Sequence, residues 1–262
     1  MNGTIPESIG QLGELKSLYL DSCSWEGFIS ENHFQNTSRL KDFTLSSEAS
    51  NSLVFNVNTI PDWFWRFSPF LEYVVLSHNQ LRGNLPKSVS STIQYVNLKN
   101  NSLVGSLPLW PNVTQLSLAN NRFSGPIPIG PEMSKLGLDG LQYLKVIDFS
   151  NNNLFGEISS SMCSQLPSLK WLRLSNNNLS GILSRLCKLA EIFLALDLAG
   201  NKFSGTIPYC IGENLHTLSY LLLGANKFIG NIPHQLCDLS SLQVLDLSQN
   251  NIFGSIPACL GG

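Results

Sequence analysis

Residues 242–260 read LQVLDLSQNNIFGSIPACL, and shorter or longer forms of this pattern recur along the chain. Each copy has spaced apolar residues, here Leu242, Leu245 and Leu247, followed by an asparagine, here Asn250. Copies begin at Leu71, Ile93, Val113, Leu144, Leu169, Phe193, Leu218 and Leu242, with looser copies at Leu15 and Leu40. Most intervals are 20–25 residues, a period typical of solenoids in which stacked repeats share one core.

The spacing within one copy predicts its local structure. Leu245 and Leu247 are two residues apart, the period-2 pattern of a strand with one buried face. One such strand per copy would stack into a parallel sheet. Downstream, Phe253, Ile256 and Leu260 are expected to point into the same core, while Gly254 lets the backbone bend.

The asparagine after each strand is the second constant feature. Its side-chain amide can pair backbone groups where the chain leaves the sheet, and a buried turn needs this because unpaired backbone groups are costly. The equivalents of Asn250 are Asn79, Asn101, Asn121, Asn152, Asn177, Asn201 and Asn226. We therefore expect a right-handed parallel β-solenoid, with the sheet on a concave face and 3₁₀ or short helical turns on the convex side.

Bulk composition favours one elongated domain. The chain has 262 residues, of which 43% are hydrophobic, enough for a continuous thin core. Its net charge of −2, with 13% charged residues, gives no electrostatic reason to expect nucleic acid or an anionic membrane as a partner. Neither an apolar run of about 18 residues nor a signal peptide occurs. We expect one domain over 1–262, of about ten repeats, that is a fragment without terminal caps because it opens mid-repeat at Asn2–Pro6.

Four of the six cysteines fall at similar places in neighbouring repeats. Stacked repeats lie about 4.8 Å apart and a disulfide tolerates Cα separations of about 4.4–6.8 Å. Cys187 can therefore reach Cys210, and Cys237 can reach Cys259. The alternative is that these residues are free buried thiols. Cys23 holds an asparagine position, which favours a free core thiol there.

Five Asn-x-Ser/Thr sequons are candidate glycosylation sites. They are Asn2, Asn36, Asn100, Asn112 and Asn178. Several could arise by chance in a chain rich in Asn and Ser, but together with the cysteines they favour an extracellular protein.

No residue pattern typical of an enzyme, a metal site or a cofactor site is found. The four histidines stand in different repeats, without the cysteine or carboxylate spacing that suits zinc, and each is expected to be solvated. They are His33, His78, His216 and His234. One strand position carries Asp148, Asp197 and Asp246, for which a structural role is expected. With no phosphate-binding glycine loop or kinase motif either, we expect no catalysis, no cofactor and no metal.

A solenoid offers surface instead. Strand residues between the buried leucines project from the concave face, and aromatic residues and Arg are enriched where proteins bind partners. The ligand-binding candidates are Tyr73, Tyr95, Trp171, Arg173 and Tyr220. Trp171 and Arg173 lie two apart on one strand, so both should point into this face. Small residues are expected beside the indole, and Asp148 and Asp197 on either side of the Arg. The alternative is that a face of this length carries a few aromatics by chance.

A G-x-I-P segment after the asparagine completes the pattern. It occurs at Gly125–Pro128, Gly205–Pro208, Gly230–Pro233 and Gly254–Pro257. With it, nearly the whole chain resembles the plant extracellular type of leucine-rich repeat protein. Finer details resemble receptor-like proteins of the disease-resistance and elicitor-receptor kind. They are Ser24–Gly27, His33–Phe34, Ser52–Val57 and Ile60–Trp65.

This resemblance implies an α/β leucine-rich repeat solenoid that recognises a ligand as the ectodomain of a receptor-like protein in plant defence. The full-length protein would be anchored by a single transmembrane helix, with its repeats on the extracellular face of the plasma membrane. Its implied partners are a peptide, glycan or protein ligand and a co-receptor kinase. The alternatives are the ectodomain of a receptor kinase and a secreted inhibitor of cell-wall-degrading enzymes.

Two intervals depart from the pattern. In the interval 40–71, Glu48 holds the asparagine position and Ile60–Pro61 sits where the second half of a separate repeat is expected, which suggests a lost or diverged half-repeat. The interval 113–144 adds residues around Gly130, which predict an enlarged convex loop.

Overall fold

The computed structural model describes residues 2–21, 24–46, 54–55, 58–67, 69–110, 112–129, 139–186 and 192–260. The chain forms two compact units, Met1–Phe123 and Ser124–Gly262. Both are built from rungs, most of which have a first strand, a turn that carries the asparagine, a short second strand and a helical turn. The single repeat domain over residues 1–262 stays a prediction.

In the first unit, the first strands form one parallel sheet. In order they are β2 (Ser17–Tyr19), β5 (Asp42–Thr44), β7 (Tyr73–Val75), β9 (Tyr95–Asn97) and β11 (Gln115–Ser117). The second strands pair in parallel as well. β1 (Asn2–Thr4) pairs with β3 (Ser24–Glu26), and β4 (Phe28–Ile29) pairs with β6 (Val54–Phe55). β10 (Ser102–Gly105) pairs with β8 (Arg82–Gly83) and with the start of β12 (Arg122–Gly125). The 3₁₀ turns are η1 (Glu7–Gln11), η2 (Glu31–Phe34) and η3 (Asp62–Trp65).

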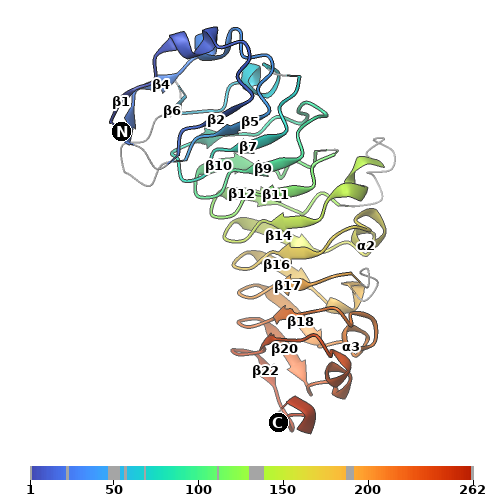
Figure 1. Cartoon of the computed structure of the whole chain (residues 1–262). Helices are drawn as coiled ribbons and strands as arrows, with labels where there is room; N and C mark the ends of the chain where they lie inside the picture. Colours follow the sequence, from blue (N-terminus) through green and yellow to red (C-terminus); the bar gives the residue numbers. More distant parts are fainter. Residues whose placement is uncertain are drawn as a thin grey trace. The chain divides into compact units, whose positions relative to one another are not determined.

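The second unit repeats this arrangement, and Figure 1 shows its second strands stacked in chain order. Its first strands are β13 (Val146–Asp148), β15 (Trp171–Arg173), β17 (Ala195–Asp197), β19 (Tyr220–Leu222) and β21 (Val244–Asp246). Its second strands, after the end of β12, are β14 (Asn153–Glu157), β16 (Asn178–Gly181), β18 (Lys202–Thr206), β20 (Lys227–Gly230) and β22 (Asn251–Ile252). The helical segments are η4 (Asp139–Tyr143), α2 (Met162–Gln165), η5 (Leu183–Leu186), α3 (Cys210–Asn214), η6 (His234–Asp238) and η7 (Ala258–Leu260).

The predicted role of the rung asparagine is confirmed, as Asn201 illustrates. Its buried amide donates to the carbonyl oxygens of Leu174, Leu198 and Ala199, at 2.9, 3.0 and 3.2 Å. Its Oδ1 accepts from the backbone N–H of Leu179 at 3.0 Å. One side chain thus closes its own turn and ties it to the preceding rung. This is why an apolar residue of similar size could not replace it without leaving buried backbone groups unpaired.

Two glycines show how closely successive rungs approach. Gly205 has φ +82°, a conformation L side chains rarely adopt, and an added Cβ would lie 3.2 Å from Cγ2 of Ile182. Gly212, in α3, faces the next rung so closely that a Cβ would lie within van der Waals overlap of the Gln235 carbonyl. A side chain at Gly212 would therefore push α3 away from η6.

In the 40–71 interval, β5 pairs directly with β7, so these two first strands are neighbours in the sheet. The lost or diverged half-repeat stays a prediction. The aromatic residues of η3 fill the added volume: Phe64 lies 5.5 Å from Phe43 between ring centroids, and Trp65 lies 5.3 Å from Trp110. The asparagine-position residue Glu48 and the predicted loop around Gly130 lie outside the described residues.

Two predicted core positions near the chain ends differ in the structure. Phe253 is 66% exposed, because the core position of its rung is taken by Ile252, as Phe228 takes it in the rung before. Ile256, which was also expected to face the core, is 68% exposed. Near the other end of the chain, Ile5 is buried. Within the part of the chain that the structure describes, no helix has the length and apolar character needed to cross a membrane.

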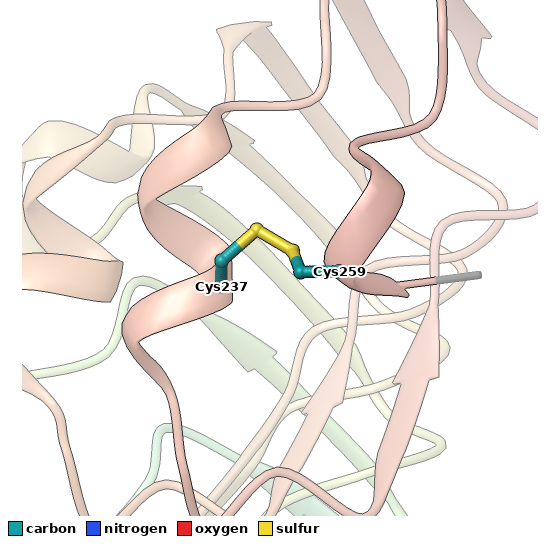
Figure 2. The surroundings of a disulfide bond; sticks show 2 residues. All are labelled: Cys237 and Cys259. Carbon is teal, nitrogen blue, oxygen red and sulfur yellow. A yellow bond between two sulfur atoms is a disulfide. The ribbon is translucent and has the colours of Figure 1, made fainter. Parts of the chain in front are cut away.

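A disulfide joins Cys237 in η6 to Cys259 in η7 (Figure 2), with their Cα atoms 5.8 Å apart. It links the helical turns of two successive rungs. The Cys237–Cys259 pair predicted from the spacing of the cysteines is therefore confirmed. Cys210, at the start of α3, is also disulfide-bonded. Its predicted partner Cys187 and the predicted free thiol Cys23 lie outside the described residues, so the Cys187–Cys210 pair stays a prediction.

Candidate ligand-binding face

The first strands of the second unit place alternate side chains on one outward face, called here the strand face. In β15, Leu172 is buried while Trp171 and Arg173 reach the surface. The parallel register sets Trp171 beside Ala195, and Ala195 beside Tyr220. One row of the face is therefore Trp171, Ala195 and Tyr220. The same register continues two residues further along each strand, where Arg173 lies beside Asp197 and Asp197 beside Leu222. The next row of the face is therefore Arg173, Asp197 and Leu222.

Trp171 and Tyr220 meet across the strand that separates them. Their ring centroids are 5.9 Å apart and the ring planes are tilted by 34°. Ala195 lies between them on the intervening strand and is only 3% exposed. A methyl side chain leaves room above it, so the two rings lean together. The Tyr220 hydroxyl donates to Oε1 of Gln243 at 3.4 Å.

Arg173 stacks on the neighbouring indole. Its guanidinium carbon lies 5.1 Å from the Trp171 ring centroid, a cation–π distance. Asp148 and Asp197 flank Arg173 in register, as predicted. Among the described residues, however, Arg173 forms no ion pair with either of them. The N–H donors of its exposed guanidinium therefore have no carboxylate partner among the described residues.

Asp148 is held by its own turn, and Asp197 by its own turn and by the preceding rung. Asp148 accepts from the backbone N–H of Ser150 at 3.2 Å and from its hydroxyl at 2.6 Å. Asp197 accepts from the Ser175 hydroxyl at 2.8 Å and the Ala199 N–H at 3.2 Å. These bonds explain why an acid recurs at this strand position, and they give it a structural role.

A depression of about 190 Å³ opens at this place on the strand face. It is lined by Trp171, Arg173, Ala195, Leu196, Asp197, Tyr220 and Leu222. The aromatic residues and Leu222 give it apolar walls, while Arg173 and Asp197 are its charged groups. Such a combination of apolar surface and a few directed polar groups is typical of a binding site.

The other aromatic pair predicted for ligand binding lies in the first unit. Tyr73 on β7 and Tyr95 on β9 stack with ring centroids 5.8 Å apart and planes 28° apart. Tyr73 is exposed and Tyr95 half-exposed. Because their faces cover each other, this pair offers ring edges and hydroxyls to solvent rather than a flat platform.

One histidine contradicts the expectation that all four are solvated. His33 in η2 is 4% exposed, and its Nε2 lies 3.0 Å from the Ile5 carbonyl oxygen. Its Nδ1 accepts from the backbone N–H of Ser30 at 3.2 Å, and the Ser30 hydroxyl donates to Glu7 at 2.8 Å. This chain of contacts buries His33 between two successive rungs. The other three histidines are exposed, and no cluster of three potential metal ligands occurs among the described residues.

The sequons differ in how the fold presents them. Asn36 and Asn178 are exposed. Asn100 and Asn112 are half-exposed and engaged: the Asn100 amide contacts His78 at 3.0 Å, and that of Asn112 donates to the Ser91 carbonyl at 3.3 Å. Asn2 lies in β1. Among the four candidate acceptors whose side-chain exposure is described, Asn36 and Asn178 are therefore the most exposed.

The contact between Trp171 and Tyr220 could not be read from their positions in separate rungs. Its signal in the sequence is the small residue Ala195, which sits between them in the same row while Val146 and Val244 hold the equivalent place in other rungs. A small residue between two aromatics of one row indicates a depression.

Comparison with known proteins agrees with this geometry. Leucine-rich repeat family models match residues 133–179, and residues 70–91, 112–132, 194–214 and 241–262. No match was found among curated protein sequences.

Three solved plant structures are similar over nearly the whole chain. The TDR receptor is 27% identical with a TM-score of 0.79, covering 99% of this chain and 43% of its own. The plant peptide hormone receptor RGFR1, in complex with RGF2, is 30% identical with a TM-score of 0.77, covering 99% and 44%. The ectodomain of the Arabidopsis receptor kinase HAESA, in complex with an extended IDA peptide hormone, is 31% identical with a TM-score of 0.77, covering 98% and 41%. Another HAESA structure, at 29% identity and TM-score 0.62, includes IDA and the co-receptor SERK1 and covers 98% and 49%. The chain thus spans less than half the length of each.

Proposed function

Because the chain belongs to the leucine-rich repeat proteins, we propose that it recognises an extracellular peptide on the strand face of its second unit, without chemically changing it. The observation that carries this proposal is the Arg173 guanidinium, stacked on Trp171 and free of any ion pair among the described residues. Aromatic residues and Arg dominate binding energy when a partner covers them. Here both are present, oriented and exposed to a partner.

A peptide is favoured over a glycan or a folded protein. The RGFR1 and HAESA structures contain peptide hormones. A peptide laid along parallel strands can also place single side chains into depressions as small as the one at Ala195. By the same analogy a co-receptor kinase is the second partner, because the HAESA structure with IDA also holds SERK1.

We place the chain in the ectodomain of a receptor-like protein at the plant plasma membrane, acting in defence. The sequons and the Cys237–Cys259 disulfide support an extracellular location, and the motifs of the 24–65 region support the receptor-like type. A receptor kinase ectodomain is the second candidate, since HAESA is a receptor kinase. Sequencing the transcript beyond Gly262 separates them: a kinase domain there would overturn the receptor-like assignment.

Panning a phage-displayed library of random linear peptides on the purified chain tests peptide recognition. We expect enriched peptides that bind the parent, are recovered intact by mass spectrometry, and bind Trp171→Ala and Arg173→Gln more weakly. Arg122→Gln, an exposed arginine on β12, is the matched control and should bind as the parent does. Failure to enrich any peptide, or equal binding by both face variants, would overturn the proposal.

A further inference from the structure

The size of the depression at Ala195 limits what can occupy it. At about 190 Å³ it holds the equivalent of about six water molecules, each occupying about 30 Å³ in the liquid. That is room for one side chain or one chain end, but not for several residues. The Trp171 and Tyr220 rings supply the apolar wall against which methylene groups can pack.

The charge in the depression selects an anion. Arg173 is the one lining cation, and its planar donors match the two oxygens of a carboxylate. Its position over the indole holds the guanidinium plane in place before a ligand arrives. Because Asp197 is already tied to Ser175 and Ala199, it does not neutralise Arg173 by direct contact.

Asp197 nevertheless shapes the selection. Its carboxylate lines the same depression and repels a second negative charge. A singly charged carboxylate can approach Arg173 while keeping away from Asp197. A phosphate, which carries up to two charges at neutral pH, is disfavoured.

Ala195 sets the depth. It is the floor between the two rings, and the equivalent residues on β13 and β21 are valines. A valine at this position would occupy the space into which the ligand group must descend, and would separate Trp171 from Tyr220.

We propose that this depression is a subsite for a single carboxylate of the peptide, bound by Arg173, with Ala195 as the residue that determines what fits. The proposal rests on the proposed function. The carboxylate can be supplied by an acidic side chain or by the C-terminus of the peptide.

Three blocked amino acids serve as probes. N-acetyl-glutamate α-amide carries a side-chain carboxylate, N-acetyl-alanine carries a terminal one, and N-acetyl-glutamine α-amide is the neutral control of the first. The readout is the indole N–H resonance of Trp171 in ¹H–¹⁵N spectra of the chain, identified by its loss in Trp171→Phe. We expect a saturable shift with one or both carboxylates and none with the glutamine probe or with inorganic phosphate. Which carboxylate binds more tightly identifies the source.

Variants assign the effect to the subsite. Arg173→Gln and Ala195→Val should each weaken carboxylate binding at least tenfold, whereas Ala195→Ser and Arg122→Gln should leave it unchanged. Thermal unfolding of each variant checks that it is folded. If Ala195→Val does not fold, carboxylate binding by Arg173→Gln alone decides whether the subsite exists. An equal shift with the neutral probe, or an undiminished shift in Arg173→Gln, would overturn the proposal.

The outcomes separate this subsite from peptide recognition itself. Suppose that library peptides bind through Trp171 and still bind after every carboxylate in them is replaced. This result would refute the carboxylate subsite but would agree with the proposed function. Conversely, a carboxylate shift that depends on Arg173, in a chain that enriches no peptide, would keep the subsite and remove the proposed function.

Discussion

At the scale of the residue, the asparagine of each rung is expected to contribute strongly to stability, because it hydrogen-bonds the buried backbone of its turn. Replacing Asn201 by Ala removes four hydrogen bonds and leaves the carbonyls of Leu174, Leu198 and Ala199 without that donor in a buried turn. Each buried group left without a partner costs about 1–3 kcal/mol, so we expect Asn201→Ala to lower the free energy of unfolding by about 3 kcal/mol or more. Urea unfolding followed by circular dichroism measures it.

Asn153 is the matched control for this prediction. It is an exposed asparagine one place after the rung asparagine Asn152. Asn153→Ala should change stability by less than about 0.5 kcal/mol. Equal losses in the two variants would show that the rung asparagine is not special.

Residue identity predicted some roles and missed others. The asparagine role follows from the sequence, because every buried turn must satisfy its own backbone groups. The burial of His33 does not, because it depends on Ile5 and on the Glu7–Ser30 bond from the neighbouring rung. Nothing in the spacing of the histidines signals those contacts.

At the scale of the element, the contact between η1 and η2 is sensitive to acid. The Ser30 hydrogen bond, helped by Asn32, lowers the pKa of Glu7 below its usual value of 4.5. A group with a lowered pKa in the fold contributes stability above the unfolded-state pKa, and loses it as the pH falls through the folded value. We expect Glu7→Gln to be less stable than the parent at pH 6 and to match it near pH 3. Urea unfolding at both values measures the difference.

The control is Glu213→Gln, whose exposed carboxylate accepts no side-chain hydrogen bond among the described residues. If the deficit of Glu7→Gln were the same at pH 6 and pH 3, the carboxylate would not act through its charge.

The disulfide between η6 and η7 should stabilise the last two rungs. It closes a loop with a sequence separation of 22 residues, for which the chain-entropy model gives about 3 kcal/mol. The double variant Cys237→Ser with Cys259→Ser should lose about that much. Non-reducing peptide mapping of protein secreted from eukaryotic cells should recover this pair and the Cys187–Cys210 pair. Recovery of all four cysteines as free thiols would refute both pairings.

At the scale of the whole molecule, apolar surface on the last rung predicts association. Phe253 and Ile256 are largely exposed, and a groove of about 610 Å³ lined by Leu242, Leu245 and Leu260 lies on the same rung. Exposed apolar patches and free strand edges favour association. We expect the purified chain to self-associate at tens of micromolar in sedimentation velocity, and Ile256→Lys to reduce this. A monodisperse monomer that unfolds cooperatively would contradict the prediction.

The architecture could be predicted from the sequence, because the same strand, turn and core positions recur in each rung. The exceptions to the repeat were harder to predict. The 40–71 interval depends on the aromatic packing of Phe43, Phe64 and Trp65, which the period does not encode. The candidate residues of the proposed binding face could be predicted from the sequence as rows of strand positions. The depression at Ala195 could not, because it depends on the rotamers of two rings from rungs that are not neighbours.

The most direct test is the affinity of one library-selected peptide for the parent chain and for Trp171→Ala, measured by calorimetry. Removing a central aromatic anchor costs about 2 kcal/mol or more of binding free energy, or about a 30-fold higher Kd. Tyr209→Ala, which removes an exposed aromatic at the start of α3, should bind as the parent does. Equal affinities for the parent, Trp171→Ala and Arg173→Ala would show that the ligand binds elsewhere and would contradict the account.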